Sequence, residues 1–351
     1  MNLNNKFVKT IILGLISVMI INLATACKPK QKLYVLNWGD YIGETVVKNF
    51  EKANPGVDVV YDVFDSNESM YPRLVDSNIP YDVIIPSDYM IEKLAKENRL
   101  NKIDMSKITN YSKVGDEFKN RSYDPTNEYS VPYMWGTVGI IYNKTLVTEP
   151  VKSWNILWDE KYSGQILMMD SLRDTMSVGL KKLGFSVNTK NVDEINAARD
   201  ALIAQKPLVA EYGGDTLKDK MISGTYALSV AYSGDAVYMM GENPDLEYVV
   251  PDEGSNIWYD AMVIPTTSKN TEMALKFIDF MTSTETTLEN VNYICYSTTQ
   301  SEAFAQLDDS FKSDPVFNPS AEVKARCAQF NDYGDSSLLY TQAWEKIRQS
   351  K

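Results

Sequence analysis

Histidine is absent from all 351 residues, and cysteine occurs only three times, at Cys27, Cys295 and Cys327. The first absence excludes Ser-His-Asp and Cys-His catalytic arrangements and any histidine-ligated metal. The sequence therefore predicts no metal site and no cofactor. Cys295 and Cys327 can pair in an exported chain or remain buried thiols, and the sequence leaves both alternatives open.

Long hydrophobic runs are rare, and the one nearest the N-terminus covers residues 11–21. That run is too short for a comfortable membrane span. Lys6 and Lys9 precede it, and Ala24-Thr25-Ala26 leads into Cys27, which is the pattern of an export signal over residues 1–26. Ordinary signal peptidase and lipoprotein processing would cut the same bond. We favour lipidation of Cys27, with residues 27–32 as anchor and tether, and hence a protein held at the outer face of the cytoplasmic membrane.

Positive charge is scarce. The chain has 35 basic and 47 acidic residues, and loss of Lys6 and Lys9 with the signal lowers its net charge from −12 to −14. An acidic surface repels nucleic acid and raises the local concentration of cations, although it also simply keeps an exported protein soluble. We expect no nucleic-acid partner.

Strand and helix patterns alternate along the mature chain, which predicts an α/β fold with a parallel sheet covered by helices on both faces. Residues 131–142 differ, because this apolar run has two central glycines and is too long for an ordinary strand. We interpret it as a strand that passes from one lobe to another near Gly136. The expected strands are 33–36, 57–63, 81–86, 131–142, 166–169, 208–210, 226–231, 248–250 and 257–264, and the expected helices are 46–53, 68–76, 91–95, 174–183, 192–204, 218–222, 273–281 and 284–291.

The returning strands divide this pattern into two lobes, residues 33–136 with 260–304 and residues 137–259 with 305–351. Two lobes joined by chain crossings form a cleft that closes on a ligand by hinge motion. Binding of that kind requires no catalytic residue.

The stretch Asn37-Trp38-Gly39-Asp40-Tyr41 follows the first predicted strand. Ligands bind at the carboxyl edge of open α/β sheets. Aromatic faces and a carboxylate attract ammonium groups, and a glycine allows close approach of the backbone. The alternative is a plain strand-to-helix turn with Trp38 and Tyr41 in the core.

Other predicted strand ends repeat the theme. Each acid or hydroxyl there can also be a helix cap, a role that we expect for Asp88 and for Asp170 or Ser171. The candidates at these ends are Ser87, Tyr89, Ser171, Asp174, Tyr232 and Asp235.

Asp260 is the most informative candidate, since it lies inside an otherwise apolar strand, where an ionised carboxylate is costly unless paired. It pairs either with an arginine or with a ligand, and Trp258 on the same strand face favours the ligand. Tyr296 and Phe330 add aromatic candidates that packing explains equally well. Acids and aromatics converging on one cleft, with no lysine or histidine among them, predict a site for an elongated polycation.

Five stretches together resemble the spermidine/putrescine-binding proteins of polyamine ABC importers. They are Asn37 to Tyr41, Phe64-Asp65-Ser66-Asn67-Glu68-Ser69-Met70-Tyr71, Tyr81-Asp82-Val83-Ile84-Ile85-Pro86-Ser87, Ser130-Val131-Pro132-Tyr133-Met134-Trp135-Gly136 and Trp258-Tyr259-Asp260. The resemblance implies a two-lobed type II periplasmic-binding-protein fold that holds a polyamine between its lobes and passes it to a membrane permease powered by a cytoplasmic ATPase. It also implies ligand contacts at Trp38, Tyr41, Ser87, Tyr89, Asp174, Trp258, Asp260 and Tyr296. We expect a monomer.

The chain departs from that family pattern at several places. Ser171 stands where spermidine-preferring members commonly have an acid, Tyr232 where many have tryptophan, and Phe330 (or Gln329, if the register shifts) where a glutamine is usual. Asp40 and Asp235 resemble acids of putrescine-preferring relatives. The length of the ligand therefore stays open. The remaining alternatives are a sensor with the same fold and a carboxylate-dependent hydrolase.

Overall fold

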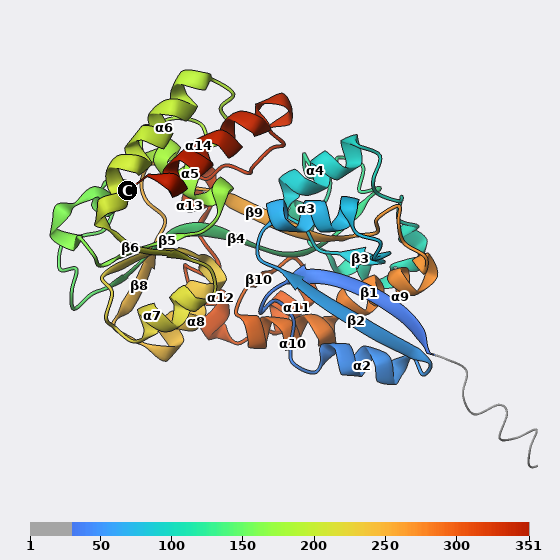
Figure 1. The fold of residues 1–351 in the computed structure, drawn as a ribbon. Coiled ribbons are helices and arrows are strands. Elements are labelled where there is room, and N and C mark those ends of the chain that lie inside the picture. Colours follow the sequence, from blue (N-terminus) through green and yellow to red (C-terminus); the bar gives the residue numbers. More distant parts are fainter. Residues whose placement is uncertain (1–29, 351) are drawn as a thin grey trace, which may run out of the picture.

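The computed structural model describes residues 30–350, and the predicted signal peptide and Cys27 lie outside them. Its sheet runs through two bodies, right and left in Figure 1, in the strand order β2-β1-β3-β9-β4-β7-β5-β6, and β10 and β8 also pair with β4. The strands are β1 (Gln31–Trp38), β2 (Val57–Phe64), β3 (Val83–Ile84), β4 (Ser130–Asn143), β5 (Ile166–Met169), β6 (Val209–Gly213), β7 (Leu228–Tyr232), β8 (Leu246–Val249), β9 (Ile257–Val263) and β10 (Ser297–Thr298).

The long strand β4 joins the two bodies. All of its fourteen residues are buried. Its first part pairs with β9 through Thr137, and its second part pairs with β7 from Val138 onward. A Cβ at Gly136 would lie 2.6 Å from the Trp258 ring, so glycine at this position allows that indole to pack close to the strand. The predicted strand 131–142 is therefore present, and its partners change where the glycines lie.

Helices surround the sheet of each body. In Figure 1, α2, α3, α4, α9 and α10 lie around β1 to β3, whereas α5, α6 and α14 lie above the left part of the sheet and α7 and α8 below it. The helices are α2 (Val46–Ala53), α3 (Asn67–Asp76), α4 (Asp88–Lys96), α5 (Leu172–Lys182), α6 (Val192–Gln205), α7 (Thr216–Ile222), α8 (Ser233–Glu242), α9 (Thr271–Met281), α10 (Thr284–Ile294), α11 (Ser301–Gln306), α12 (Asp309–Ser313), α13 (Ala321–Arg326) and α14 (Ser337–Gln349). Within residues 30–350, every helix is too short or too polar to cross a bilayer.

Several predicted boundaries were wrong. Strand β6 begins after the predicted 208–210 start because Lys206–Leu208 forms a 3-10 helix around Pro207, which has no N–H to give to a sheet. Strand β7 begins at Leu228 rather than at residue 226, and β3 keeps only two of six predicted residues. Helix α8, the helices after α10 and the 3-10 helices of residues 105–118 were not predicted. The 3-10 helices and α11 to α13 are too short for a clear apolar period, whereas α14 buries Tyr340, Ala343, Trp344 and Ile347 at helical spacing and could have been found.

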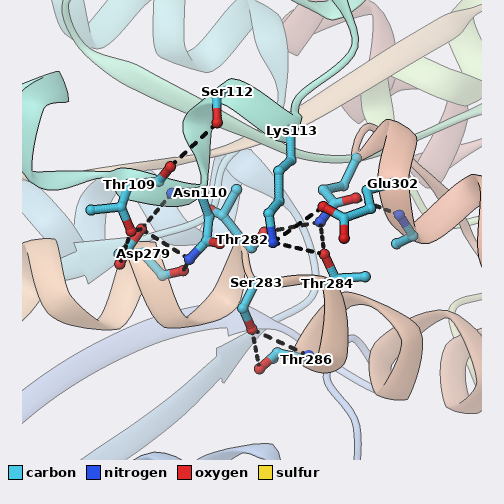
Figure 2. Close-up of polar contacts among 12 residues, drawn as sticks. Thr109, Asn110, Ser112, Lys113, Asp279, Thr282, Ser283, Thr284, Thr286 and Glu302 are labelled. Carbon is cyan, nitrogen blue, oxygen red and sulfur yellow. Dashed lines mark hydrogen bonds and ion pairs between the residues drawn. The ribbon is translucent and has the colours of Figure 1, made fainter.

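A polar cluster fixes one of these 3-10 helices, Thr109–Lys113, against α9, α10 and α11 (Figure 2). Asp279 accepts hydrogen bonds from the backbone N–H of Asn110 at 2.9 Å and from the Thr109 hydroxyl at 3.0 Å. Lys113 donates to the Thr284 hydroxyl at 3.0 Å and pairs with Glu302 at 3.2 Å. These contacts tie the 3-10 helix to α9, α10 and α11.

Candidate ligand-binding site

A cavity of about 540 Å³ opens where the carboxyl ends of β1, β2, β5 and β7 meet strand β9. The structure brings all fourteen predicted site residues to its lining. They are Trp38, Gly39, Asp40, Tyr41, Ser87, Tyr89, Ser171, Asp174, Tyr232, Asp235, Trp258, Asp260, Tyr296 and Phe330. Their role in ligand binding stays a prediction.

Aromatic rings form a continuous wall of the cavity. The Tyr296 ring lies edge-on to Tyr41 at 5.3 Å between centroids and tilts against Trp258 at 5.5 Å. Tyr232 follows at 5.9 Å from Trp258. Gly234 admits the Tyr296 ring, because a Cβ at this position would come within 2.3 Å of it. These rings are packed in the core and also line the cavity, so core packing leaves them accessible to a ligand.

Asp260 is buried on β9 with its side chain at the cavity, and 5% of its surface is exposed. Its Oδ1 atom has no hydrogen-bond partner among the described residues, and neither do the Trp258 indole N–H and the Tyr41 hydroxyl. Burial raises the pKa of Asp260 to about 7, and the hydroxyls of Ser87 and Tyr41 oppose this rise from nearby, although the Tyr41 hydroxyl does not reach a hydrogen-bonding geometry. The alternative of an arginine pair is wrong, since the described residues give Asp260 no ion pair. A cation in the cavity would supply the missing partner.

Asp174 is the second acid of the cavity. Its Oδ2 accepts hydrogen bonds from the Ser171 hydroxyl at 2.6 Å and from the Tyr232 hydroxyl at 2.8 Å. Burial raises its pKa, and these two hydroxyls lower it. Ser171 is also the N-cap of α5 and accepts from the Asp174 N–H, as predicted. Asp174 is therefore fixed through its Oδ2 atom, and the neighbouring Arg173 guanidinium and Asn256 side chain also lower its pKa.

Asp88 does not cap α4, so that prediction was wrong. Ser87 occupies the N-cap position, and Asp88 is the first helical residue. It is completely buried and accepts hydrogen bonds from the N–H groups of Tyr89 at 2.7 Å and Tyr259 at 3.3 Å. Asp88 thus fixes β9 against α4, beside Asp260. Asp235 is likewise no cap, because Tyr232 precedes α8 and Asp235 lies in its first turn.

The prediction that no lysine lies among the acids was also wrong. The Lys218 amino group is 3.3 Å from an Asp40 oxygen, 3.5 Å from Asp215 and 3.7 Å from Asp235. Sequence reasoning followed strand ends, whereas Lys218 lies within α7 and reaches the cavity only through tertiary packing.

A second cation, Arg173, also lines the cavity. Its guanidinium lies 4.3 Å from the Tyr89 ring centroid, 4.4 Å from Phe330 and 3.5 Å from Tyr333, and donates two hydrogen bonds of 3.1 Å to the Asn331 carbonyl. The Arg173 guanidinium thus occupies the ring faces of Tyr89 and Phe330 that a ligand ammonium group would otherwise contact.

Sequence reasoning missed further lining residues, among them Glu68 and Asp65. Glu68 accepts a hydrogen bond of 3.0 Å from the Tyr89 hydroxyl, and burial raises its pKa. Asp65 directly follows β2 and Glu68 lies in the first turn of the next helix, α3, so the rule applied to the other strand ends would have found them.

The sequence model of the bacterial extracellular solute-binding proteins matches residues 45–319. The chain belongs to this family. It is 34% identical, over 318 residues, to the spermidine/putrescine-binding periplasmic protein of Salmonella typhimurium, covering 90% of this chain and 91% of the relative. It is 29% identical to the putrescine-binding periplasmic protein SpuD of Pseudomonas aeruginosa, with 99% of both chains covered.

Two solved structures of this solute-binding family agree. The substrate-binding protein of a spermidine/putrescine ABC transporter from Streptococcus pneumoniae is 38% identical, with a TM-score of 0.75 over 91% of this chain and 100% of that one. The Tp0655 lipoprotein of Treponema pallidum is 28% identical, with a TM-score of 0.81 over 90% and 99%. The predicted two-lobed fold and the resemblance to the spermidine/putrescine-binding proteins are confirmed. The relatives are transport binding proteins of the periplasm or cell exterior rather than enzymes.

The sequence left open whether Cys295 and Cys327 form a disulfide or remain thiols, and in the structure they are not paired. Cys295 and Cys327 are both free thiols, and burial raises the pKa of each.

Proposed function

We propose that this protein is the substrate-binding component of a polyamine ABC importer, which captures putrescine or spermidine between its lobes and delivers it to membrane permease subunits. The observation that carries the proposal is the buried Asp260 carboxylate, whose Oδ1 atom has no hydrogen-bond partner among the described residues, beside Tyr41 and Trp258 in the cavity. The names of the relatives support the same ligand class.

Ligand capture follows from the charges of the cavity. Asp260 and Asp174 each present a carboxylate oxygen, and the rings of Tyr41, Trp258 and Tyr232 supply faces for ammonium groups and methylenes. Leaving a buried charge unpaired costs about 3 to 5 kcal/mol. Only a ligand with ammonium groups at the spacing of the acids can therefore close the lobes without a penalty.

The lobes that close are residues 33–136 with 260–304 and residues 137–259 with 305–351. Support comes from β4, whose first part pairs with β9 and β10 and whose second part pairs with β7 and β8. The fourteen cavity residues predicted from the sequence act as ligand contacts in this scheme. The protein works as a monomer and catalyses no reaction.

Export and anchoring complete the proposal. The signal of residues 1–26 is removed, and the lipidated Cys27 holds the protein at the outer face of the cytoplasmic membrane. One relative carries the name lipoprotein, which supports this assignment. Detergent-phase partition of the mature protein tests it. An unmodified Cys27 and partition into the aqueous phase would contradict lipidation.

A calorimetric competition titration with putrescine, spermidine and spermine tests the ligand class. We expect saturable binding of at least one of them in the micromolar range, about −8 kcal/mol, and no binding of a neutral diol of the same length. If none of the three amines changes the Tm of the protein, polyamine binding is refuted. Permease and ATPase genes beside the gene for this protein distinguish an importer component from a sensor.

A further inference from the structure

The cavity already contains an ammonium group of its own. Lys218 projects from α7 into an outer acid cluster, which we define as Asp40, Asp215 and Asp235. All three carboxylates lie within 3.7 Å of its Nζ atom, and the Lys218 side chain is only 16% exposed. Asp40 follows β1 in the right body, whereas α7 and α8 belong to the left body (Figure 1). The lysine therefore sits where the two bodies meet.

The surroundings of this lysine have the chemistry expected of a ligand amine site. Asp235 is partly buried beside Tyr296, with 18% of its side chain exposed, and desolvation raises its pKa to about 6 against the opposing effect of Lys218. Burial acts against the charge on Lys218 as well, but the three carboxylates raise its pKa above the ordinary value. Tyr296 contacts Tyr41 and Trp258, so the ring wall runs from the outer acid cluster toward Asp260.

Beyond Asp260 the wall continues to Tyr232, which donates to Asp174. The next acid, Glu68, lies in the field of the Arg173 guanidinium, which lowers its raised pKa. The cavity thus has a fixed cation by the outer acid cluster and another by Glu68. Neither Asp260 nor Asp174 forms an ion pair with a described residue, although the neighbouring Arg173 guanidinium lowers the raised pKa of Asp174.

We propose that Lys218 is a specificity-determining residue whose amino group fills the outer acid cluster, so that the site accepts a diamine with two ammonium groups in preference to a triamine. A triamine would have to displace Lys218 or place its third ammonium beside a like charge. The inference rests on the proposed function and adds the ligand length, which the sequence left open.

A competition titration of putrescine against spermidine tests the proposal on the wild type, Lys218→Met and Lys218→Gln. The wild type is expected to favour putrescine by about tenfold or more, and both variants to move the affinity ratio toward spermidine by about tenfold or more. Lys218→Arg keeps the charge and should keep the preference. Lys220→Met is the matched control, because this residue lies on the same helix, pairs with Glu211 and does not line the cavity.

The outcomes separate the two proposals. If the wild type binds no amine, the proposed function fails. If the wild type favours spermidine, or if the putrescine-to-spermidine ratio is the same in Lys218→Met, Lys218→Gln and the wild type, Lys218 does not set specificity, whereas polyamine binding stands. A lysine that merely clamps the lobes would change both affinities together and leave the ratio constant. Thermal unfolding with and without spermidine shows that each variant is folded.

Discussion

Replacing Asp260 with asparagine isolates the charge that the proposed function depends on, because the two side chains have nearly the same shape. In the complex, the carboxylate is the partner of a buried ammonium group. Removing one partner of such a pair costs about 2 to 5 kcal/mol, which corresponds to a loss of affinity between about thirtyfold and several thousandfold. We expect polyamine binding to weaken by at least about tenfold. This lower limit applies if the ligand amine stays half-solvated in the complex and so loses less when its carboxylate partner is removed.

The same substitution should stabilise the protein without ligand. The pKa of Asp260 is raised to about 7 in the folded chain. The ordinary value for aspartate is about 3.9, so keeping this carboxylate ionised at pH 8 costs up to about 4 kcal/mol of folding free energy. The pKa of Asp260 is higher in the folded chain than in the unfolded chain. Its contribution to folding stability is therefore fully present below the unfolded pKa of about 3.9 and is lost as the pH rises through the folded pKa of about 7. Asparagine removes the cost at pH 8.

Calorimetry and thermal unfolding at pH 8 measure both effects on one preparation. The expected result is weaker polyamine binding together with a Tm that is higher by several degrees, since about 1 kcal/mol shifts Tm by roughly 2 to 4 °C in a chain of this size or somewhat smaller. Asp76→Asn is the control, since Asp76 is exposed at the end of α3 and does not line the cavity. Near-native affinity in Asp260→Asn would refute the role of this carboxylate.

Three further predictions follow from the same cavity. Polyamine affinity should fall about tenfold per pH unit below pH 7, because the ligand needs Asp260 ionised; the slope should shrink in Asp260→Asn, and a flat profile in the wild type would contradict the raised pKa. Gly234→Ala places a Cβ 2.3 Å from the Tyr296 ring and should cost about 1 to 3 kcal/mol of unfolding free energy and weaken binding; unchanged denaturant midpoint and affinity would mean that the ring can move away freely. Tyr232→Phe removes the 2.8 Å hydrogen bond to Asp174 and should weaken binding by a few fold in calorimetry without loss of fold, whereas tighter binding would show that the hydroxyl competes with the ligand.

The sequence by itself determined the fold class and the kinds of side chain at the site. Polar and aromatic residues directly after the strands of an α/β pattern must meet at one sheet edge. The sequence alone therefore predicted one shared site for Trp38, Tyr41, Asp174 and Tyr232. Asp260 was recognisable because a carboxylate inside an apolar strand needs a partner.

Only the tertiary structure decided which charges neutralise one another. Lys218 and Asp40 are 178 positions apart, and no local pattern relates a lysine within a short helix to an aspartate after the first strand. Arg173 likewise lies between rings from distant segments. The positions of strand ends can be predicted from the local pattern of apolar and polar residues, because that pattern is contained in each short segment of the sequence. Ion pairs between lobes depend on how the lobes pack, and that packing is a property of the whole chain.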